Sequence, residues 1–398
     1  MKVLGITAEY NPFHNGHKYH IEESRRITGA DCVVAVMSGY FTQRGEAAAL
    51  DKWTRSRLAV ANGADLVVEL PFVYACNIAE RFAKGAVDIL AGLGADYISF
   101  GSENGDIKSL TEVAGLMVDK AQMISSKRSE IMQSGASFAK AGQLAVEELF
   151  GKSAAALMSE PNNILAIEYL KRIKSINSAG GGIEAVTVKR HGSGYFELND
   201  ALGFAGASAI RKMEERTEFE KFVPADVADA LGEAESKTAC ENRSFDIIRA
   251  EILKNSSEDL AKIYHMGEGL ENKLKKEIVK ATDMDSLISS IVSKRYTEAA
   301  VRRLLVYVLL GIRQYHMPEG VYARILAAND KGRELLSKLK KRDDAIPVIT
   351  NINKATDVSD VVKETLSYDV MAADMYNLIQ GKDIYDFSDK VIKPYMDK

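Results

Sequence analysis

Cysteine is scarce in this chain, with three residues among 398. Cys32, Cys76 and Cys240 lie far apart, and none belongs to a CxxC pair or stands at a zinc-binding spacing from histidine. A structural zinc site and a disulfide-stabilised scaffold are therefore disfavoured. A sparse, odd number of thiols favours a protein that works in the reducing cytoplasm.

Long hydrophobic runs are also missing. The first apolar run, Val3–Ala8, is too short for a signal-peptide core and is expected to be a strand. The longest run further on, Leu304–Ile312, has nine residues, whereas a membrane-spanning helix needs about 20. With 46% hydrophobic and 27% charged residues, the chain has the composition of a globular protein of two or three domains. The sequence predicts a soluble, cytoplasmic protein without membrane contact, and it says nothing about the oligomeric state.

The formal net charge is only −4, but positive charge is concentrated locally. Between residues 294 and 342, twelve Lys or Arg residues stand against four Asp or Glu residues. Such a segment favours a polyanionic partner, because phosphate contacts made by Lys and Arg release condensed counterions. The alternative is a solvated helix face whose charge is balanced by acidic residues elsewhere in the fold.

Short, nearly continuous Val/Ile/Leu runs alternate with helical patterns in the first half of the chain. This alternation predicts an α/β fold with a Rossmann-like parallel sheet, in which the strands are buried on both faces. The expected strands are Lys2–Ala8, Asp31–Met37, Asp65–Glu69, Asp96–Phe100 and Glu184–Lys189, and the expected helices between them are Gly16–Thr28, Leu50–Asn62, Ile78–Leu93 and Asn162–Lys174.

Helical periodicity dominates the second half. After about residue 215 no convincing strand pair is expected, although Val348–Ile349 suits a short strand. We therefore divide the chain into an α/β domain, residues 1–215, and a mainly α-helical domain, residues 216–398. Residues 106–150 are predicted to form an inserted pair of helices that is broken near Ser134–Gly135.

The junction between the first strand and the first helix has the most informative chemistry. His14 and His17 flank Asn-Gly at the place where a strand's carboxyl end meets a helix N-terminus. Ligands of open α/β sheets bind at this edge, and helix N-termini suit phosphate. Gly16 allows close backbone approach, and the two imidazoles can donate N–H groups to phosphate oxygens. A metal site is disfavoured because no further ligand set is present, and the remaining alternative is a simple helix cap.

This His-x-Gly-His pattern resembles the signature of the HxGH nucleotidylyltransferase superfamily. Ala207–Arg211 resembles the second phosphate-binding motif of that superfamily, S/T-x-I-R. Further runs resemble the bacterial tRNA(Met) cytidine acetate ligases, and these similar runs are residues 8–17, 36–39, 43–46, 51–53, 69–71, 100–103, 160–165, 190 with 192–195, and 293–297. Phe196 and Glu197 depart from the family pattern, so no role is assigned to them.

The resemblance implies an ATP-dependent ligase. Such an enzyme converts acetate and ATP to acetyl-AMP and pyrophosphate, and then acetylates the wobble cytidine of elongator tRNA(Met) to N4-acetylcytidine. Mg²⁺ is expected to accompany the nucleotide, and no protein-held metal is expected. Both histidines would act on the α-phosphate as the catalytic residues, and Ser208 and Arg211 would bind the β- and γ-phosphates. The implied ATP-binding residues are Thr7, Ala8, Glu9, Tyr10, Asn11, Pro12, Phe13, His14, Asn15, Gly16, His17, Lys18, Tyr19, His20, Gly101, Asn162, Asn163, Arg190, Ser208 and Arg211.

Several of these assignments have structural alternatives. Gly101 suits an ordinary turn, Arg190 suits a surface position, and either Asn162 or Asn163 suits an N-cap. The resemblance favours one of the two asparagines as a nucleotide contact without deciding which.

Two polar groups lie outside the ATP motifs. Gln43, Arg44, Asp51, Lys52 and Arg55 suit either an exposed helix with i,i+4 pairs such as Asp51–Arg55, or a loop near the acceptor or acetate. In the helical domain, one aromatic residue accompanies several cationic side chains, as in many RNA-binding surfaces. The tRNA-binding residues expected there are Lys294, Arg295, Tyr296, Arg302 and Arg303, and the alternative is again a solvated basic face.

Two other functions remain open from the residues alone. A nucleotidylyltransferase that adenylylates a small phosphorylated metabolite would share the His-x-Gly-His pattern without needing a basic helical domain. A non-catalytic RNA-binding protein that retains an ATP fold would not be expected to keep His14, Gly16, His17, Ser208 and Arg211 together.

Overall fold

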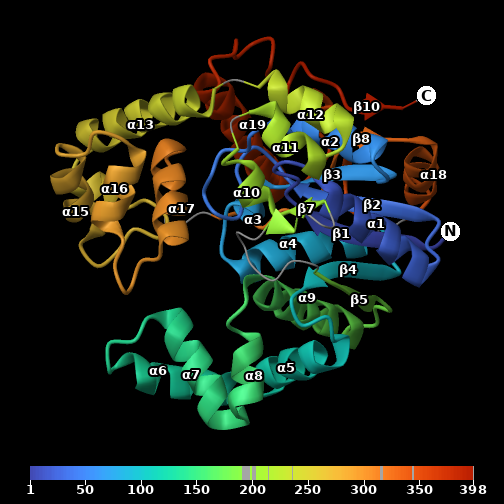
Figure 1. The fold of residues 1–398 in the computed structure, drawn as a ribbon, viewed down its shortest axis with the longest axis horizontal. Helices are drawn as coiled ribbons and strands as arrows, with labels where there is room; N and C mark the ends of the chain where they lie inside the picture. The colour runs from blue at the N-terminus through green and yellow to red at the C-terminus, as the bar shows by residue number, and fades with distance from the viewer. Residues whose placement is uncertain are drawn as a thin grey trace.

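The computed structural model describes residues 1–190, 198–199, 203–213, 215–234, 236–313, 317–342 and 345–397. Eight strands of this part of the chain form one sheet in the order β10–β8–β3–β2–β1–β4–β5, with β9 paired to β8 (Figure 1). All paired neighbours are parallel except β3 and β8. The strands are β1 (Val3–Ala8), β2 (Cys32–Ser38), β3 (Leu66–Leu70), β4 (Tyr97–Ser102), β5 (Glu184–Lys189), β8 (Ala323–Ala328), β9 (Val348–Ile349) and β10 (Tyr395–Met396).

The predicted α/β fold is confirmed, and strands β1 to β5 lie within two residues of their predicted ends. The predicted helices are present as α1 (Asn15–Thr28), α2 (Lys52–Ala61), α4 (Ala79–Gly92) and α9 (Pro161–Ser178). Successive strand residues point to opposite faces of the sheet, so both faces of these apolar strands require cover. The helices provide it on both faces. Val34 and Val36 of β2 belong to one hydrophobic core, and Val33 and Ala35 belong to the other.

The predicted insertion, residues 106–150, contains three helices instead of two, and a short fourth helix follows it. They are α5 (Ile107–Asp119), α6 (Ala121–Met132), α7 (Phe138–Phe150) and α8 (Lys152–Leu157). The predicted break near Ser134–Gly135 lies between α6 and α7, and Gly135 has φ +88° there. The break that the sequence missed falls at Lys120, where neither glycine nor proline marks the end of a helix.

Helices α13 (Lys237–Lys254), α15 (Leu270–Ile278), α16 (Met284–Ile291) and α17 (Glu298–Leu309) gather to one side of the sheet (Figure 1). The apolar run that begins at Leu304 is buried in this group and against the larger core. In the part of the chain that the structure describes, no helix combines the length and the apolar character needed to cross a bilayer.

The expectation that no strand pair follows residue 215 is wrong. The chain returns to the sheet through β8, which pairs antiparallel with β3, and then adds α18 (Asp330–Leu339), β9, α19 (Asp360–Ile379) and β10. The segment Ala323–Ala328 is rich in alanine and contains Arg324, so local propensity gave no strand signal. Its strand conformation comes from complete burial beside β3. The suggested boundary near residue 215 stays a prediction.

Candidate active site

The turn between β1 and α1 is buried. Tyr10 has φ +47°, the Asn11–Pro12 bond is cis, and Tyr10, Asn11 and Phe13 are almost inaccessible to solvent. The ring of Tyr10 packs against Phe13 and meets His17 edge-on, at centroid distances of 4.8 and 5.0 Å. A left-handed tyrosine is unfavourable by itself, so this packing is what keeps the turn in place. The turn leaves His14 as the N-cap residue of α1.

His14 and His17 stack on one another with ring centroids 3.6 Å apart and planes inclined by 22°. The backbone N–H of His14 donates to Nδ1 of His17 at 3.3 Å, so neutral His17 has its proton on Nε2. The buried Nδ1 of His14 has no hydrogen-bond partner among the described residues. A Cβ at Gly16 would lie 3.0 Å from the His14 ring, so glycine at this position leaves room for the imidazole.

The histidines of this turn are neutral at neutral pH. Burial, with a smaller contribution from the positive charge of Arg190, lowers the pKa of His14 to about 3 and that of His20 to about 4. Burial followed by the charges of His14, Arg190 and His20 lowers the pKa of His17 well below its usual value. Each ring therefore offers an N–H donor without adding a formal charge.

These neutral imidazoles predict an acid-sensitive fold. In the unfolded chain each histidine titrates near pH 6.5, so below that pH the unfolded state binds more protons than the folded state. The stabilisation is fully present above pH 6.5 and is lost toward the folded-state pKa, by about 1.4 kcal/mol per pH unit for each such group. Urea unfolding between about pH 7.5 and pH 5 should therefore show a shallower loss of stability for His20→Gln than for the wild type.

The measurement compares the pH dependence of the free energy of unfolding in His20→Gln and in the wild type. The wild-type slope alone is not sufficient, because protonation of Glu69 stabilises the folded state as the pH falls. Burial raises the pKa of Glu69, although the charge of Lys52 beside it acts to lower that pKa. Equal slopes for the two proteins would contradict the neutral state of His20.

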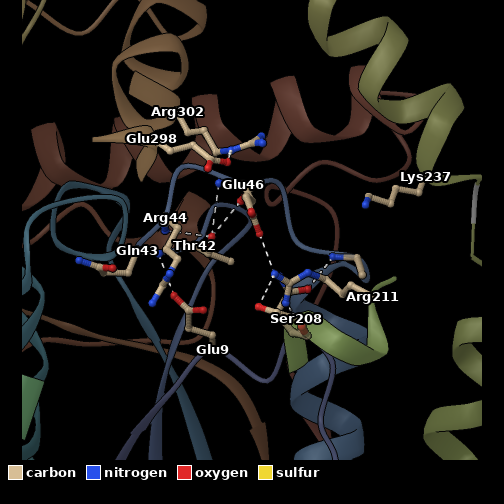
Figure 2. A network of polar contacts seen from close by, with 12 residues as sticks. Glu9, Thr42, Gln43, Arg44, Glu46, Ser208, Arg211, Lys237, Glu298 and Arg302 are labelled. Atoms are coloured by element: carbon tan, nitrogen blue, oxygen red, sulfur yellow. Dashed lines mark hydrogen bonds and ion pairs between the residues drawn. The ribbon is translucent and has the colours of Figure 1, made fainter. Parts of the chain in front are cut away.

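The second predicted phosphate motif lies directly against the His-x-Gly-His turn. The one-turn helix α10 (Ala207–Ile210) carries Ser208 and is followed by Arg211. Arg211 donates from Nη1 to the carbonyl oxygen of Asn11 at 2.7 Å, and from Nη2 to Glu46 Oε2 at 2.8 Å and to Ser208 Oγ at 3.5 Å (Figure 2). The two motifs, about 190 residues apart in sequence, therefore meet at one edge of the sheet.

Other predicted contacts of the first motif are divided between the site and the surface. Asn15 donates from Nδ2 to the carbonyl oxygens of Gly203 and Lys221, at 3.2 and 3.0 Å. Tyr19 packs against Phe204 of β7 (Phe204–Ala205), with ring centroids 5.8 Å apart. Lys18 is exposed on α1.

At the ends of β4 and β5, Gly101 and Arg190 are neighbours. A Cβ at Gly101 would lie 3.2 Å from Cγ of Arg190, so the arginine stem crosses over the glycine. Arg190 thereby projects from the sheet edge on which His14 lies. Phe196 and Glu197, with the similar run at residues 192–195, lie outside the described residues.

The two predicted asparagines are engaged by Glu103. The carboxylate of Glu103 accepts hydrogen bonds from the backbone N–H groups of Asn162 and Asn163 and from Asn162 Nδ2, at 3.2, 2.8 and 2.6 Å. Asn163 Oδ1 accepts in return from the backbone N–H groups of Glu103 and Asn104. Glu103 therefore satisfies the first N–H groups of α9. The N-cap residue is Glu160, so the alternative that Asn162 or Asn163 is the N-cap is wrong; the sequence could not identify Glu103, because its two partners lie 59 and 60 positions away.

The polar group after β2 is not an exposed helix. Arg55 is buried and donates to the carbonyl oxygens of Glu9 and Ser38 at 2.6 and 3.0 Å, and also to that of Gly39. Lys52 is fully buried between the carboxylates of Glu69 and Asp389, at 2.7 and 2.5 Å. The surface interpretation is therefore wrong for these two residues, because inside the fold buried carbonyl oxygens require hydrogen-bond donors and buried carboxylates require cationic partners.

The five basic and aromatic residues predicted to bind tRNA have different surroundings. Lys294 and Arg295 are exposed, and Arg295 pairs with Glu268 at 2.7 Å. The hydroxyl of Tyr296 donates to a backbone carbonyl at 3.2 Å, and its ring is partly buried. Arg302 pairs with Glu298 at 2.9 Å and with Asp285 at 3.2 Å. Arg303 donates to the carbonyl oxygen of Gln43 at 2.9 Å, so it faces the catalytic side of the molecule.

No group of three or more His, Cys, Asp or Glu side chains among the described residues is arranged to hold a metal ion. The polar edge formed by His14, His17, Arg190, Ser208 and Arg211 instead presents neutral and cationic donors. Such a set suits an anion, and a polyphosphate in particular.

Comparisons with known proteins agree with this geometry. A family model described as HIGH Nucleotidyl Transferase matches residues 1–389. The tRNA(Met) cytidine acetate ligase of Thermoanaerobacter sp. (strain X514) is 40% identical over 390 residues, covering 95% of each chain, and that of Acetivibrio thermocellus is 38% identical over 398 residues, covering 94% of each. Crystal structures of Thermotoga maritima TmcAL, apo and bound with alpha-thio ATP, superpose with TM-scores of 0.88 and 0.87 at 29% identity, over 100% of this chain and 99% of theirs.

Proposed function

The chain belongs to the HIGH nucleotidyl transferase family and, within it, to the tRNA(Met) cytidine acetate ligases, and we propose that it catalyses the reaction this name describes. A carboxylate oxygen of acetate attacks the α-phosphorus of ATP, the bond to the β-phosphate breaks, and pyrophosphate leaves. The exocyclic amine of the tRNA cytidine then attacks the carbonyl carbon of acetyl-AMP, AMP leaves, and the amine loses a proton. ATP, acetate and an elongator tRNA(Met) are the substrates.

The observation that carries this proposal is the contact between the two phosphate motifs. Arg211 donates to the carbonyl oxygen of Asn11, three residues before the stacked histidines, so one nucleotide can reach both motifs. His14 and His17 would donate to the α-phosphate while its negative charge is redistributed, and Ser208 and Arg211 would hold the leaving pyrophosphate. No covalent enzyme intermediate is needed, because both attacking groups belong to the substrates.

Mg²⁺ fits this site as a companion of the nucleotide. It favours oxygen ligands and keeps several waters, so phosphate oxygens would hold it without a dedicated carboxylate cage. It would neutralise part of the polyphosphate charge. The cationic groups Arg190 and Arg211 would contribute to the same neutralisation from the protein side.

The tRNA contact is proposed for the helical group of α13, α15, α16 and α17, where Lys294 and Arg295 are exposed. They shortly precede α17, and Arg303 of that helix donates to the carbonyl oxygen of Gln43. ATP and tRNA are cytoplasmic substrates, and we propose that the enzyme works there.

Acetate-dependent ATP–pyrophosphate exchange, followed by nucleoside mass spectrometry of tRNA incubated with the enzyme, tests the function. The proposal requires exchange that depends on acetate, and N4-acetylcytidine in tRNA(Met). Exchange with a phosphorylated metabolite and without acetate would favour a metabolite nucleotidylyltransferase. Tight tRNA binding without any exchange would favour a non-catalytic RNA-binding protein.

A further inference from the structure

The turn Thr42–Glu46 connects the helical group with both ATP motifs. The turn closes on itself, because the backbone N–H of Thr42 donates to the carbonyl oxygen of Glu46 at 2.9 Å and that of Gly45 donates to the carbonyl oxygen of Thr42 at 3.1 Å. The buried Thr42 Oγ1 accepts from the backbone N–H groups of Arg44 and Glu46 at 3.2 and 3.3 Å. The backbone of Glu46 is therefore fixed from within the turn.

The turn is also fixed from outside. Gly45 has φ +77°, and a Cβ there would lie 2.3 Å from the backbone nitrogen of Arg303 and 2.4 Å from the carbonyl carbon of Arg302. Arg303 holds the turn through the carbonyl oxygen of Gln43, and the backbone N–H of Gln43 donates to Glu9 Oε1 at 2.8 Å. The turn thus sits between α17 and the end of β1, and a displacement of it would disturb contacts on both sides.

From this fixed backbone the side chain of Glu46 reaches Arg211 (Figure 2). We infer that Glu46 is a positioning residue: it holds the Arg211 guanidinium in the orientation that binds the polyphosphate of ATP. The inference rests on the proposed function, since it takes Arg211 to be a phosphate ligand.

The geometry gives Arg211 two strong acceptors, Asn11 O on one nitrogen and Glu46 Oε2 on the other. Two acceptors on different nitrogens fix the plane of a guanidinium, whereas one would let it rotate. A guanidinium has five N–H groups, so donors remain for phosphate after these two are used. Without Glu46, Arg211 would keep the hydrogen bond to Asn11 O and the weaker contact to Ser208 Oγ at 3.5 Å. Its guanidinium would then have to be ordered when ATP binds, which reduces the binding free energy.

The test is a double-substitution experiment on full-length protein, with kcat and KM for ATP measured by acetate-dependent ATP–pyrophosphate exchange. Glu46→Ala should lower kcat/KM for ATP by about 10- to 100-fold, the value of one charge-assisted hydrogen bond. Glu46→Gln retains a carbonyl acceptor and should recover part of this activity. Combined with Arg211→Ala, Glu46→Ala should add little, because Glu46 acts through that arginine.

Glu298→Ala serves as the matched control. It removes the carboxylate that forms an ion pair with Arg302, near the turn Thr42–Glu46 (Figure 2). Among the described residues, Glu298 makes no hydrogen bond or ion pair with Arg211. Exchange should stay at the wild-type level, and melting temperatures of all variants show whether the fold is retained.

Three results would overturn the inference, and they separate its failure from that of the proposed function. If Arg211→Ala impairs exchange and Glu46→Ala does not, the positioning role is wrong while the proposed function stands. If the two effects multiply in the double variant, Glu46 acts independently of Arg211. If Arg211→Ala leaves exchange unchanged, the phosphate role of Arg211 fails, and Glu46 has no ligand to position.

Discussion

Replacing His14 or His17 by alanine is expected to reduce acetate-dependent ATP–pyrophosphate exchange by about 10²- to 10³-fold, because each ring supplies one preorganised donor to charge at the α-phosphate. Both rings are neutral, so the reduction should reflect the missing N–H donor and not a missing positive charge. The rings stack 3.6 Å apart, so removing one also frees the other to move. The double variant should therefore be impaired far less than the product of the two single effects.

The conservative substitution His17→Asn separates structure from chemistry. Its side-chain oxygen can still accept the backbone N–H of His14, as Nδ1 of His17 does, so the helix cap is retained. If His17 only caps α1, His17→Asn should restore exchange. If His17 acts on the phosphate, His17→Asn should stay close to His17→Ala. Near wild-type exchange in both alanine variants, with unchanged melting temperatures, would remove the histidines from the mechanism.

The second large effect is a separation of the two half-reactions. Replacing Lys294 and Arg295 by alanine should weaken tRNA binding and reduce the slope of log K against log salt by roughly 0.7–0.9 for each phosphate that the protein no longer neutralises. Exchange does not involve RNA and should persist. The converse variant, Ser208→Ala with Arg211→Ala, should lose exchange and still bind tRNA.

The structure restricts this experiment to two of the five predicted tRNA residues. Substituting Arg303 would remove the hydrogen bond to Gln43 in the turn Thr42–Glu46, and substituting Arg302 would also remove its ion pairs with Asp285 and Glu298, so neither change would alter tRNA contact alone. Lys331→Ala with Lys338→Ala is the matched control. It removes the same charge from the same basic stretch, but on α18 at the opposite side of the molecule (Figure 1).

Unchanged tRNA affinity in Lys294→Ala with Arg295→Ala would show that these residues form only a solvated surface. Equal weakening by the α18 control would show that net charge, and not a specific surface, governs binding. Parallel loss of exchange and tRNA binding in the first variant, with an unchanged melting temperature, would contradict the division of labour between the two parts of the chain.

Local sequence patterns determined the first half of the fold well. Buried strands such as β2 are short apolar runs, and helices such as α1 begin and end at recognisable residues, with His14 at one end and Gly29 in the left-handed conformation at the other. The His-x-Gly-His turn was recognisable because its chemistry is contained in four consecutive residues. These features depend on neighbours in the chain, which is the information that a single sequence displays directly.

The features that the sequence left undetermined all rest on distant partners. Strand β8 takes its conformation from β3, about 260 residues earlier. Lys52 is buried beside Asp389, an ion-pair partner that lies 337 positions away in the sequence. Glu46 faces Arg211 because α17 supports the turn that carries it. The sequence alone determined the α/β fold, the phosphate motifs and the family, since these follow from local spacing. Only the tertiary structure decided which cations are buried, which are exposed and which acid holds Arg211, because burial and pairing depend on contacts that close long loops of chain.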